Sequence, residues 1–138
     1  MRIVLDTKVL VSGLLSPFGA PGQIVRMAAA GALSVCFDAR IVAEYEEVLA
    51  RPRFGFDPQP VRALLDYLVA HGEVTAGLPL SASLPDHDDE PFLEVAIAGR
   101  AESLVTGNVA HFPLEAPAGI CVLTPAGFLE FYRGQGPD

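Results

Sequence analysis

Acidic residues gather at a few places in this sequence, and their carboxylates are suited to binding a divalent cation. Asp6 ends an apolar run, and four acids fall within residues 86–90. Glu44, Glu46 and Glu47 fall within four consecutive positions. Closely packed carboxylates repel one another unless water or a cation separates them, and hard cations such as Mg²⁺ or Mn²⁺ prefer oxygen ligands. The pattern therefore indicates metal or phosphate chemistry.

Ordinary structural roles could also explain several of these acids. Asp6 stands where it could cap a helix that begins near Val9, and one acid of residues 86–90 could cap the helix that follows. The other acids of that turn would favour the positive end of the same helix. Four acids nevertheless exceed what capping requires. At a later strand end, residues 106–108 offer a hydroxyl and a carboxamide, which a plain Asx turn explains equally well.

The helix expected over residues 39–50 presents its three glutamates differently. At about 100° per residue, its apolar side chains form one stripe that faces the core, made of Ile41, Val42, Tyr45, Val48 and Leu49. Glu47 then faces solvent, whereas Glu44 and Glu46 lie on opposite margins of the stripe. Periodicity alone does not choose between Glu44 and Glu46.

The spacing of the cysteines and histidines does not indicate a metal site. Cys36 and Cys121 lie in apolar, strand-like segments, so we expect buried thiols rather than a disulfide. His87 and His111 have no partners at metal-ligand spacing, and we expect both at the surface.

The composition predicts one folded domain. The chain has 138 residues, of which 51% are hydrophobic and 19% charged, enough to bury a core. No apolar run approaches the ~18 residues of a membrane span, and signal-peptide features are missing, so we expect a cytoplasmic protein with no membrane partner. The net charge of −8 argues against a broad basic face for nucleic acid, although a bound divalent metal would invert the local field.

Strands and helices alternate along the chain, which predicts an α/β fold with a mostly parallel sheet covered on both faces. Strands are expected at residues 1–5, 33–37, 73–76, 103–106 and 120–123. Helices are expected at residues 9–15, 23–30, 39–50, from 57–58 to 72, 91–98 and 125–132. Such sheets place the active crevice at the carboxyl ends of the strands, where Asp6 and the other polar features should lie or approach.

Five sequence blocks, spread in order over nearly the whole chain, match one known family. They read VLDTKVLVSGLLSP (4–17), AEYEEVLARPRF (43–54), LPDHDDEPFLEVAIA (84–98), LVTGNVAHFP (104–113) and VLTPAGFL (122–129). They resemble the PIN-domain family, in its prokaryotic branch of toxin–antitoxin toxin components. The resemblance implies a three-layer α/β/α sandwich with a five-stranded sheet in the order 3-2-1-4-5. We expect one PIN-like domain over residues 1–133 and a frayed tail at residues 134–138.

The resemblance also implies an acidic cleft of metal ligands. Carried onto this sequence, the family's catalytic positions are Asp6, Glu44, Asp89 and Asn108. The block AEY selects Glu44 over Glu46, and the spacing DxxF favours Asp89. Asp6, Glu44 and Asp89 would bind Mg²⁺ or Mn²⁺, which generates hydroxide and stabilises charge on a scissile phosphate.

Two positions depart from the family pattern, and further residues are expected around the ligands. Lys8 stands where the family usually has Asn, and Asn108 where it often has Asp. The first change adds a cation near the cleft, and the second removes an anion. Asp86 and Asp88 are expected to support the ligands, and Thr106 to position water or a phosphate oxygen together with Asn108.

The resemblance implies that the protein is a metal-dependent endoribonuclease that cleaves single-stranded RNA. It also implies a small antitoxin protein as partner, and a homodimer is one open alternative for the oligomeric state. Arg51 and Arg53 would contact the RNA backbone, or simply favour a helix C-terminus. One alternative is a degenerate PIN module that binds RNA or a protein without cleavage. A phosphatase with an Asp nucleophile ranks low, because that class needs a second Asp where Lys8 stands.

Overall fold

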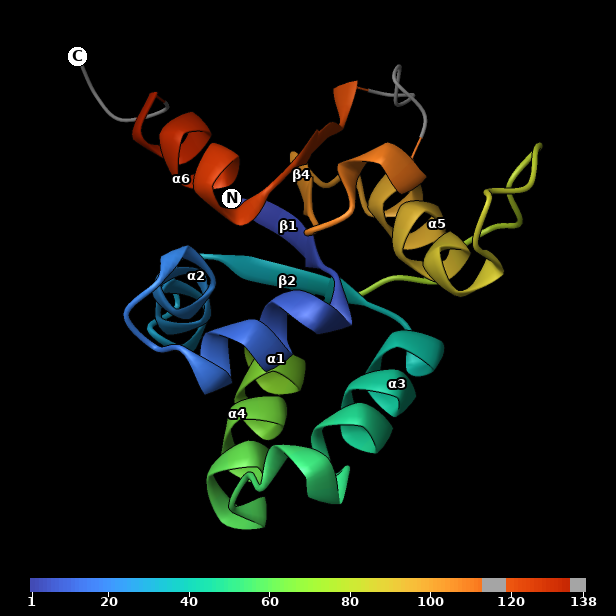
Figure 1. The fold of residues 1–138 in the computed structure, drawn as a ribbon. Coiled ribbons are helices and arrows are strands. Elements are labelled where there is room, and N and C mark those ends of the chain that lie inside the picture. The colour runs from blue at the N-terminus through green and yellow to red at the C-terminus, as the bar shows by residue number, and fades with distance from the viewer. Residues whose placement is uncertain (113–118, 135–138) are drawn as a thin grey trace.

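The computed structural model describes residues 1–112 and 119–134, which form a five-stranded sheet (Figure 1). The strands are β1 (Arg2–Leu5), β2 (Ser34–Phe37), β3 (Glu73–Val74), β4 (Ser103–Val105) and β5 (Cys121–Leu123). Their order is β3-β2-β1-β4-β5, and all four neighbouring pairs are parallel. The predicted fold class and strand order are confirmed.

Within residues 1–112 and 119–134, six α-helices connect and cover the strands, and each corresponds to a predicted one. They are α1 (Thr7–Leu15), α2 (Ala20–Ala29), α3 (Ala39–Leu49), α4 (Pro58–His71), α5 (Glu90–Ala98) and α6 (Pro125–Gly134). Short 3₁₀ helices, which the sequence did not predict, include η1 (Pro52–Phe54), η2 (His87–Asp89) and η3 (Val109–His111). Helix α6 runs one residue past the predicted domain end, and residues 135–138 lie outside the described part of the chain.

Helices α1 and α2 begin two and three residues earlier than predicted, and both starts have a local cause. Helix α1 begins at Thr7 because the Asp6 carboxylate accepts a hydrogen bond from the backbone N–H of Lys8, as an N-cap does. Helix α2 begins at Ala20, with Pro21 in its first turn, where a missing N–H costs nothing.

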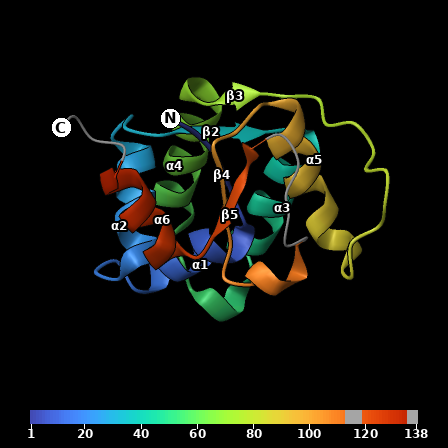
Figure 2. The same cartoon turned by 90° about the horizontal axis from the view of Figure 1, so that it is seen from above.

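The helices lie on both faces of the sheet. Helices α2 and α6 lie together on one face and α5 on the other, as Figures 1 and 2 both show. The central strands are buried on both sides, and Ile3, Val4, Leu5, Leu104 and Val105 are all 0% exposed. This is the pattern of an interior parallel sheet, whose strands are apolar on both faces.

The backbone pairing of β1 and β4 continues into the first polar residues beyond the strands. The N–H of Asp6 donates to the carbonyl of Val105 at 3.0 Å, and the N–H of Thr106 donates to the carbonyl of Leu123 at 2.9 Å. Asp6 and Thr106 are therefore held side by side at the carboxyl edge of the sheet.

The cysteines and the helix lengths bear on two other expectations. Cys36 and Cys121 are free, the first buried and the second half-buried. Burial, with a smaller effect from the Glu73 charge, raises the pKa of the Cys36 thiol to about 11. Among the described residues, no helix combines the length and apolar character needed to cross a membrane.

Candidate functional site

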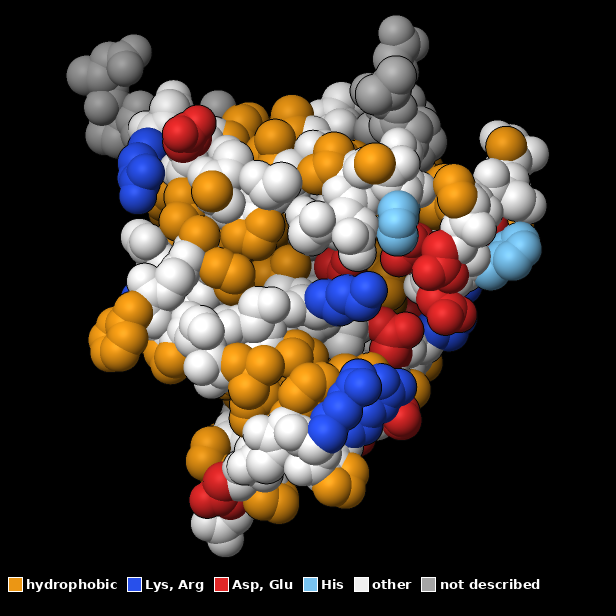
Figure 3. Space-filling model, viewed as in Figure 1, with side chains coloured by type: hydrophobic (Ala, Val, Ile, Leu, Met, Phe, Trp, Pro, Cys, Tyr) orange, Lys and Arg blue, Asp and Glu red, His pale blue; other side chains and the backbone are white. Residues whose placement is uncertain are grey.

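A cleft of about 400 Å³ opens at the carboxyl edge of the sheet. Segments far apart in the sequence contribute its walls: the β1–α1 junction, α3, η1, the acidic turn at η2, the start of α5, and η3. Figure 3 shows acidic side chains gathered on this side of the molecule, with Lys and Arg side chains bordering them. The polar and charged lining residues are Asp6, Thr7, Lys8, Ser12, Glu44, Arg51, Arg53, Asp86, Asp88, Asp89 and His111.

Asp6 caps a helix, which is one of the two roles considered from the sequence, and it also lines the cleft. Its side chain caps α1 through the N–H of Lys8, at 3.4 Å from Oδ1. Its other oxygen accepts a hydrogen bond from the hydroxyl of Thr106, with 2.7 Å between Oγ1 and Oδ2. Asp6 is only 6% exposed, so these bonds are needed to stabilise its charge. Asp6 can therefore be an N-cap and still line the cleft.

Tyr45 and Glu44 connect α3 to the β1–α1 junction at the cleft. Its buried hydroxyl donates to the carbonyl of Leu5 at 2.6 Å, which ties α3 to the end of β1. The neighbouring Glu44 is thereby brought to the start of α1, where the hydroxyl of Thr7 donates to Glu44 Oε2. Glu44 is half-buried and lines the cleft.

The other two glutamates of α3 point elsewhere and have cationic partners. Glu46 lies 3.1 Å from Nη1 of Arg62 on α4, and Glu47 lies 2.8 Å from Nη2 of Arg51. Both glutamates are exposed, as is expected for surface ion pairs. The structure thus separates Glu44 from Glu46, a choice that periodicity left open.

The acids in and beside the η2 turn differ in their hydrogen bonds to the backbone. Asp86 caps η2 by accepting a hydrogen bond from the N–H of Asp88 at 2.9 Å. Glu90 accepts one from the N–H of Leu84 at 2.9 Å. Asp89 precedes α5 but makes no side-chain capping bond. Its carboxylate is therefore left for the cleft.

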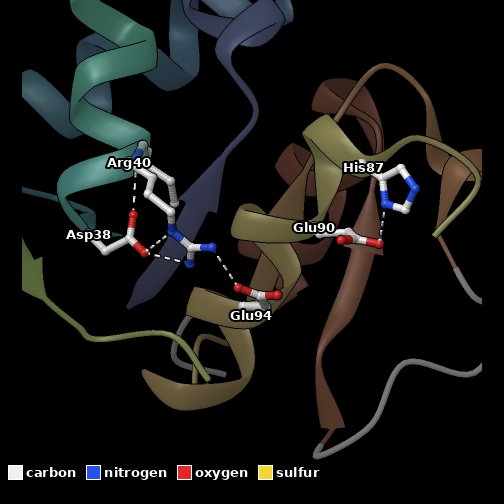
Figure 4. A network of polar contacts seen from close by, with 6 residues as sticks. Asp38, Arg40, His87, Glu90 and Glu94 are labelled. Atoms are coloured by element: carbon white, nitrogen blue, oxygen red, sulfur yellow. Dashed lines mark hydrogen bonds and ion pairs between the residues drawn. The ribbon is translucent and has the colours of Figure 1, made fainter. Parts of the chain in front are cut away.

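His111 is a cleft residue that the sequence did not reveal. Its Nδ1 lies 3.2 Å from Oδ2 of Asp89, and the side chain is half-buried. The expectation that both histidines lie at the surface holds for His87, which is exposed with Nδ1 3.1 Å from Glu90 Oε2 (Figure 4). For His111 this expectation is incomplete, because the residue is half-buried and lines the cleft. The only sequence signal was the matched block TGNVAHFP, in which His111 has no neighbouring acid.

Like charges across the cleft oppose ionisation of its acids. Burial is the main cause that raises the pKa of Glu44, the hydroxyl of Thr7 opposes the rise, and the charges of Asp6 and Asp89 add to it. Burial also raises the pKa of Asp89, against the hydrogen bond from His111. The carboxylates of the cleft are thus close enough for their charges to repel one another.

This donor set fits a divalent cation. Asp6 and Glu44 form no ion pair among the described residues, and their side-chain partners are hydroxyls and a backbone N–H. One ligand atom from each of Asp86, Asp89 and His111 lies within 4.8 Å of the other two. Oxygen-rich sites suit Mg²⁺ and Mn²⁺, and an imidazole is acceptable to a transition metal.

The remaining predicted site residues fall into two groups. Lys8, Arg51 and Arg53 are exposed and line the cleft together with the acids. Thr106 is fully buried behind Asp6, whereas Asn108 does not line the cleft. The backbone N–H of Asn108 donates to Oγ1 of Thr106 at 3.1 Å, so its observed contact with the site is made by the main chain.

Comparison with known proteins agrees with this architecture. The structure is similar to one chain of the crystal structure of VapBC2 from Rickettsia felis bound to a DNA fragment from their promoter, with a TM-score of 0.52 and 16% sequence identity. The match covers 89% of this chain and 97% of that chain, and at this identity it supports the fold. No curated protein has a significant match. A family model described as PIN domain matches residues 2–110, which contain Asp6, Glu44 and Asp89, and the chain therefore belongs to the PIN-domain family.

Proposed function

We propose that this protein is a metal-dependent endoribonuclease that cleaves single-stranded RNA. The observation that carries the proposal is the convergence of Asp6, Glu44 and Asp89 on one cleft, where no described Lys or Arg pairs with them. Membership of the PIN-domain family supports it.

The chain's own contribution is to orient three carboxylates. Each of them has a separate donor: Thr106 for Asp6, Thr7 for Glu44 and His111 for Asp89. Each donor engages one oxygen and leaves lone pairs for a cation. A bound Mg²⁺ or Mn²⁺ would supply a hydroxide nucleophile and stabilise charge on the scissile phosphate.

The cationic side of the cleft would hold the RNA backbone. Lys8, Arg51 and Arg53 line it, and phosphate contacts of this kind position a strand without reading its sequence. Arg51 already pairs with Glu47, so its contribution is smaller than that of the other two. Because the net charge is −8, productive contact would be limited to this cleft.

We further propose that the protein is the toxin of a toxin–antitoxin pair, with a small antitoxin protein as partner. The five matched sequence blocks and the fold similarity to the VapBC2 structure support this role. Co-expression with the product of a small adjacent open reading frame tests it: the partner should co-purify with the protein and suppress RNA cleavage.

Cleavage of a mixed RNA pool tests the enzymatic proposal. Single-stranded RNA should be cut in the presence of Mn²⁺ and left intact in EDTA, and Asp6→Asn should abolish cutting while the protein stays folded. Equal cutting by the wild type and Asp6→Asn, with matching thermal unfolding, would remove Asp6 from the mechanism.

The structure also favours a second candidate, a degenerate PIN module that binds RNA without cleaving it. The specific observation is Lys8, a cation that lines the cleft beside the proposed ligands. This alternative predicts that RNA binds with the same affinity in Mn²⁺ and in EDTA, and that no cutting occurs with either.

A further inference from the structure

Arg53, Phe54 and Phe56 form a stack at the edge of the cleft. The guanidinium carbon of Arg53 lies 4.8 Å from the centroid of the Phe54 ring. The rings of Phe54 and Phe56 stack with centroids 5.6 Å apart and 18° between their planes. Arg53 and Phe54 line the acidic cleft, whereas Phe56 lines the adjacent depression between α3 and α4.

The local sequence brings the three residues of this stack close together. The run RPRFGF begins with Pro52 in the first turn of η1 and turns at Gly55, whose φ of 65° favours glycine. The turn brings Phe54 and Phe56, two positions apart, onto the same side. Because η1 follows directly after α3, the stack is connected to the helix that carries Glu44.

Among the residues that the structure describes, Arg53 differs from two other arginines of this region in having no acidic partner. Arg51 pairs with Glu47 at 2.8 Å, and Arg62 pairs with Glu46 at 3.1 Å. Within residues 1–112 and 119–134, Arg53 forms no hydrogen bond or ion pair, and its guanidinium lies over the Phe54 ring. Its exposed guanidinium is therefore available to a ligand that can stack on it.

We propose that Arg53, Phe54 and Phe56 form a nucleobase-binding subsite, in which one base of a single-stranded RNA stacks while the adjoining phosphate enters the acidic cleft. The inference rests on the proposed function, because it takes single-stranded RNA as the ligand. Unpaired bases stack on aromatic rings and guanidinium planes, whereas bases within a duplex have no free face.

The charge of the protein agrees with this mode of recognition. A net charge of −8 leaves little attraction for a phosphate backbone, and stacking supplies affinity without requiring a basic face. The cleft volume of about 400 Å³ is also within the range that holds small ligands, so a nucleotide-sized group fits beside the stack.

Binding measured in EDTA tests the subsite apart from any cleavage. The probes are a fluorescent single-stranded RNA oligonucleotide and an abasic oligonucleotide of the same length. Arg53→Lys keeps the charge but removes the planar group, and Phe54→Leu removes the ring. Each should weaken binding of the base-containing probe about tenfold, the usual scale for one stacked base. Arg133→Lys on α6 and the exposed Phe18→Leu, both outside the cleft, are matched controls.

The outcomes separate this proposal from the nuclease proposal. Equal binding of the two probes by the wild type, no binding of either, or unchanged binding by both variants would each overturn the subsite, even if Mn²⁺-dependent cleavage is present. Base-dependent binding that both variants lose supports the subsite. If cleavage is then missing in Mn²⁺, the nuclease proposal fails and the subsite stands.

Discussion

Helices α3 and α5 face each other through two very different sets of charges. In the first turn of α3, Arg40 lies 2.8 Å from Glu94 of α5 and 2.6 Å from Asp38 (Figure 4). Four residues further along α3, Glu44 lines the same cleft as Asp89, which precedes α5. The same pair of helices therefore carries complementary charges in one place and like charges in the other.

The pKa shifts in the two places have different causes. Hydrogen bonds to Asp38 and then Glu94 raise the pKa of Arg40, so its charged form is stabilised. Burial raises the pKa values of Glu44 and Asp89, and neighbouring acids add to the rise, so their charged forms are disfavoured. The complementary charges link α3 to α5, and the like charges of the cleft create the field that a divalent cation would neutralise.

Removing an acid from the like-charged set should have the largest effect. Glu44→Gln should weaken Mn²⁺ binding about tenfold to a hundredfold, since even residues that only orient a metal ligand contribute this much. Glu47→Gln, an exposed member of the same helix paired with Arg51, should bind Mn²⁺ like the wild type. Calorimetric titration measures both, and equal losses would contradict the placement of Glu44 at the metal.

Breaking the ion pairs of Arg40 with Asp38 and Glu94 should instead lower the stability of the protein. Arg40→Ala leaves Glu94, which is only 8% exposed, without its cation. Because Arg40 itself is about half exposed, solvent moderates the loss, and the free energy of unfolding should fall by about 1–2 kcal/mol. Urea unfolding measures the change. Arg62→Ala, which breaks the exposed pairs with Glu46 on α3 and Asp66 on α4, is the control and should unfold like the wild type.

Lys8 tests whether a cation at the cleft weakens metal binding. Lys8→Asn should tighten Mn²⁺ binding about twofold to fivefold, a modest factor because Lys8 is exposed and its charge is screened. Lys8→Arg keeps the charge and should behave like the wild type. An unchanged Mn²⁺ isotherm for Lys8→Asn would mean that the ammonium swings into solvent.

The pH dependence of stability should show the smallest effect. The folded-state pKa of Glu44 is raised, so its ionisation opposes folding at neutral pH, and this penalty fades as pH falls through that pKa. Metal-free Glu44→Gln should therefore melt slightly above the wild type near pH 7, and the difference should shrink toward pH ~4. A thermal scan over this pH range measures it, and a difference that grows in acid would contradict the sign.

Much of the fold was predictable because its signals are local. Short apolar runs, capping residues and the Pro and Gly positions predicted every strand and α-helix, with starts shifted by no more than three residues. Asp6 was predictable for the same reason, since it follows β1 directly and parallel strands end at one edge of the sheet.

The sequence by itself determined the alternation of elements and the position of Asp6, because both depend on neighbours along the chain. The family resemblance of the sequence also selected Glu44 and Asp89, and the tertiary structure decided how these residues and the rest of the cleft are arranged. Periodicity describes a helix only about its own axis, so it left Glu44 and Glu46 as equal candidates. The tertiary structure places Glu44 beside Thr7 of α1 and Glu46 beside Arg62 of α4. The contact of His111 with Asp89 spans 22 residues and depends on where η3 lies after β4, a placement that packing of the whole sheet decides.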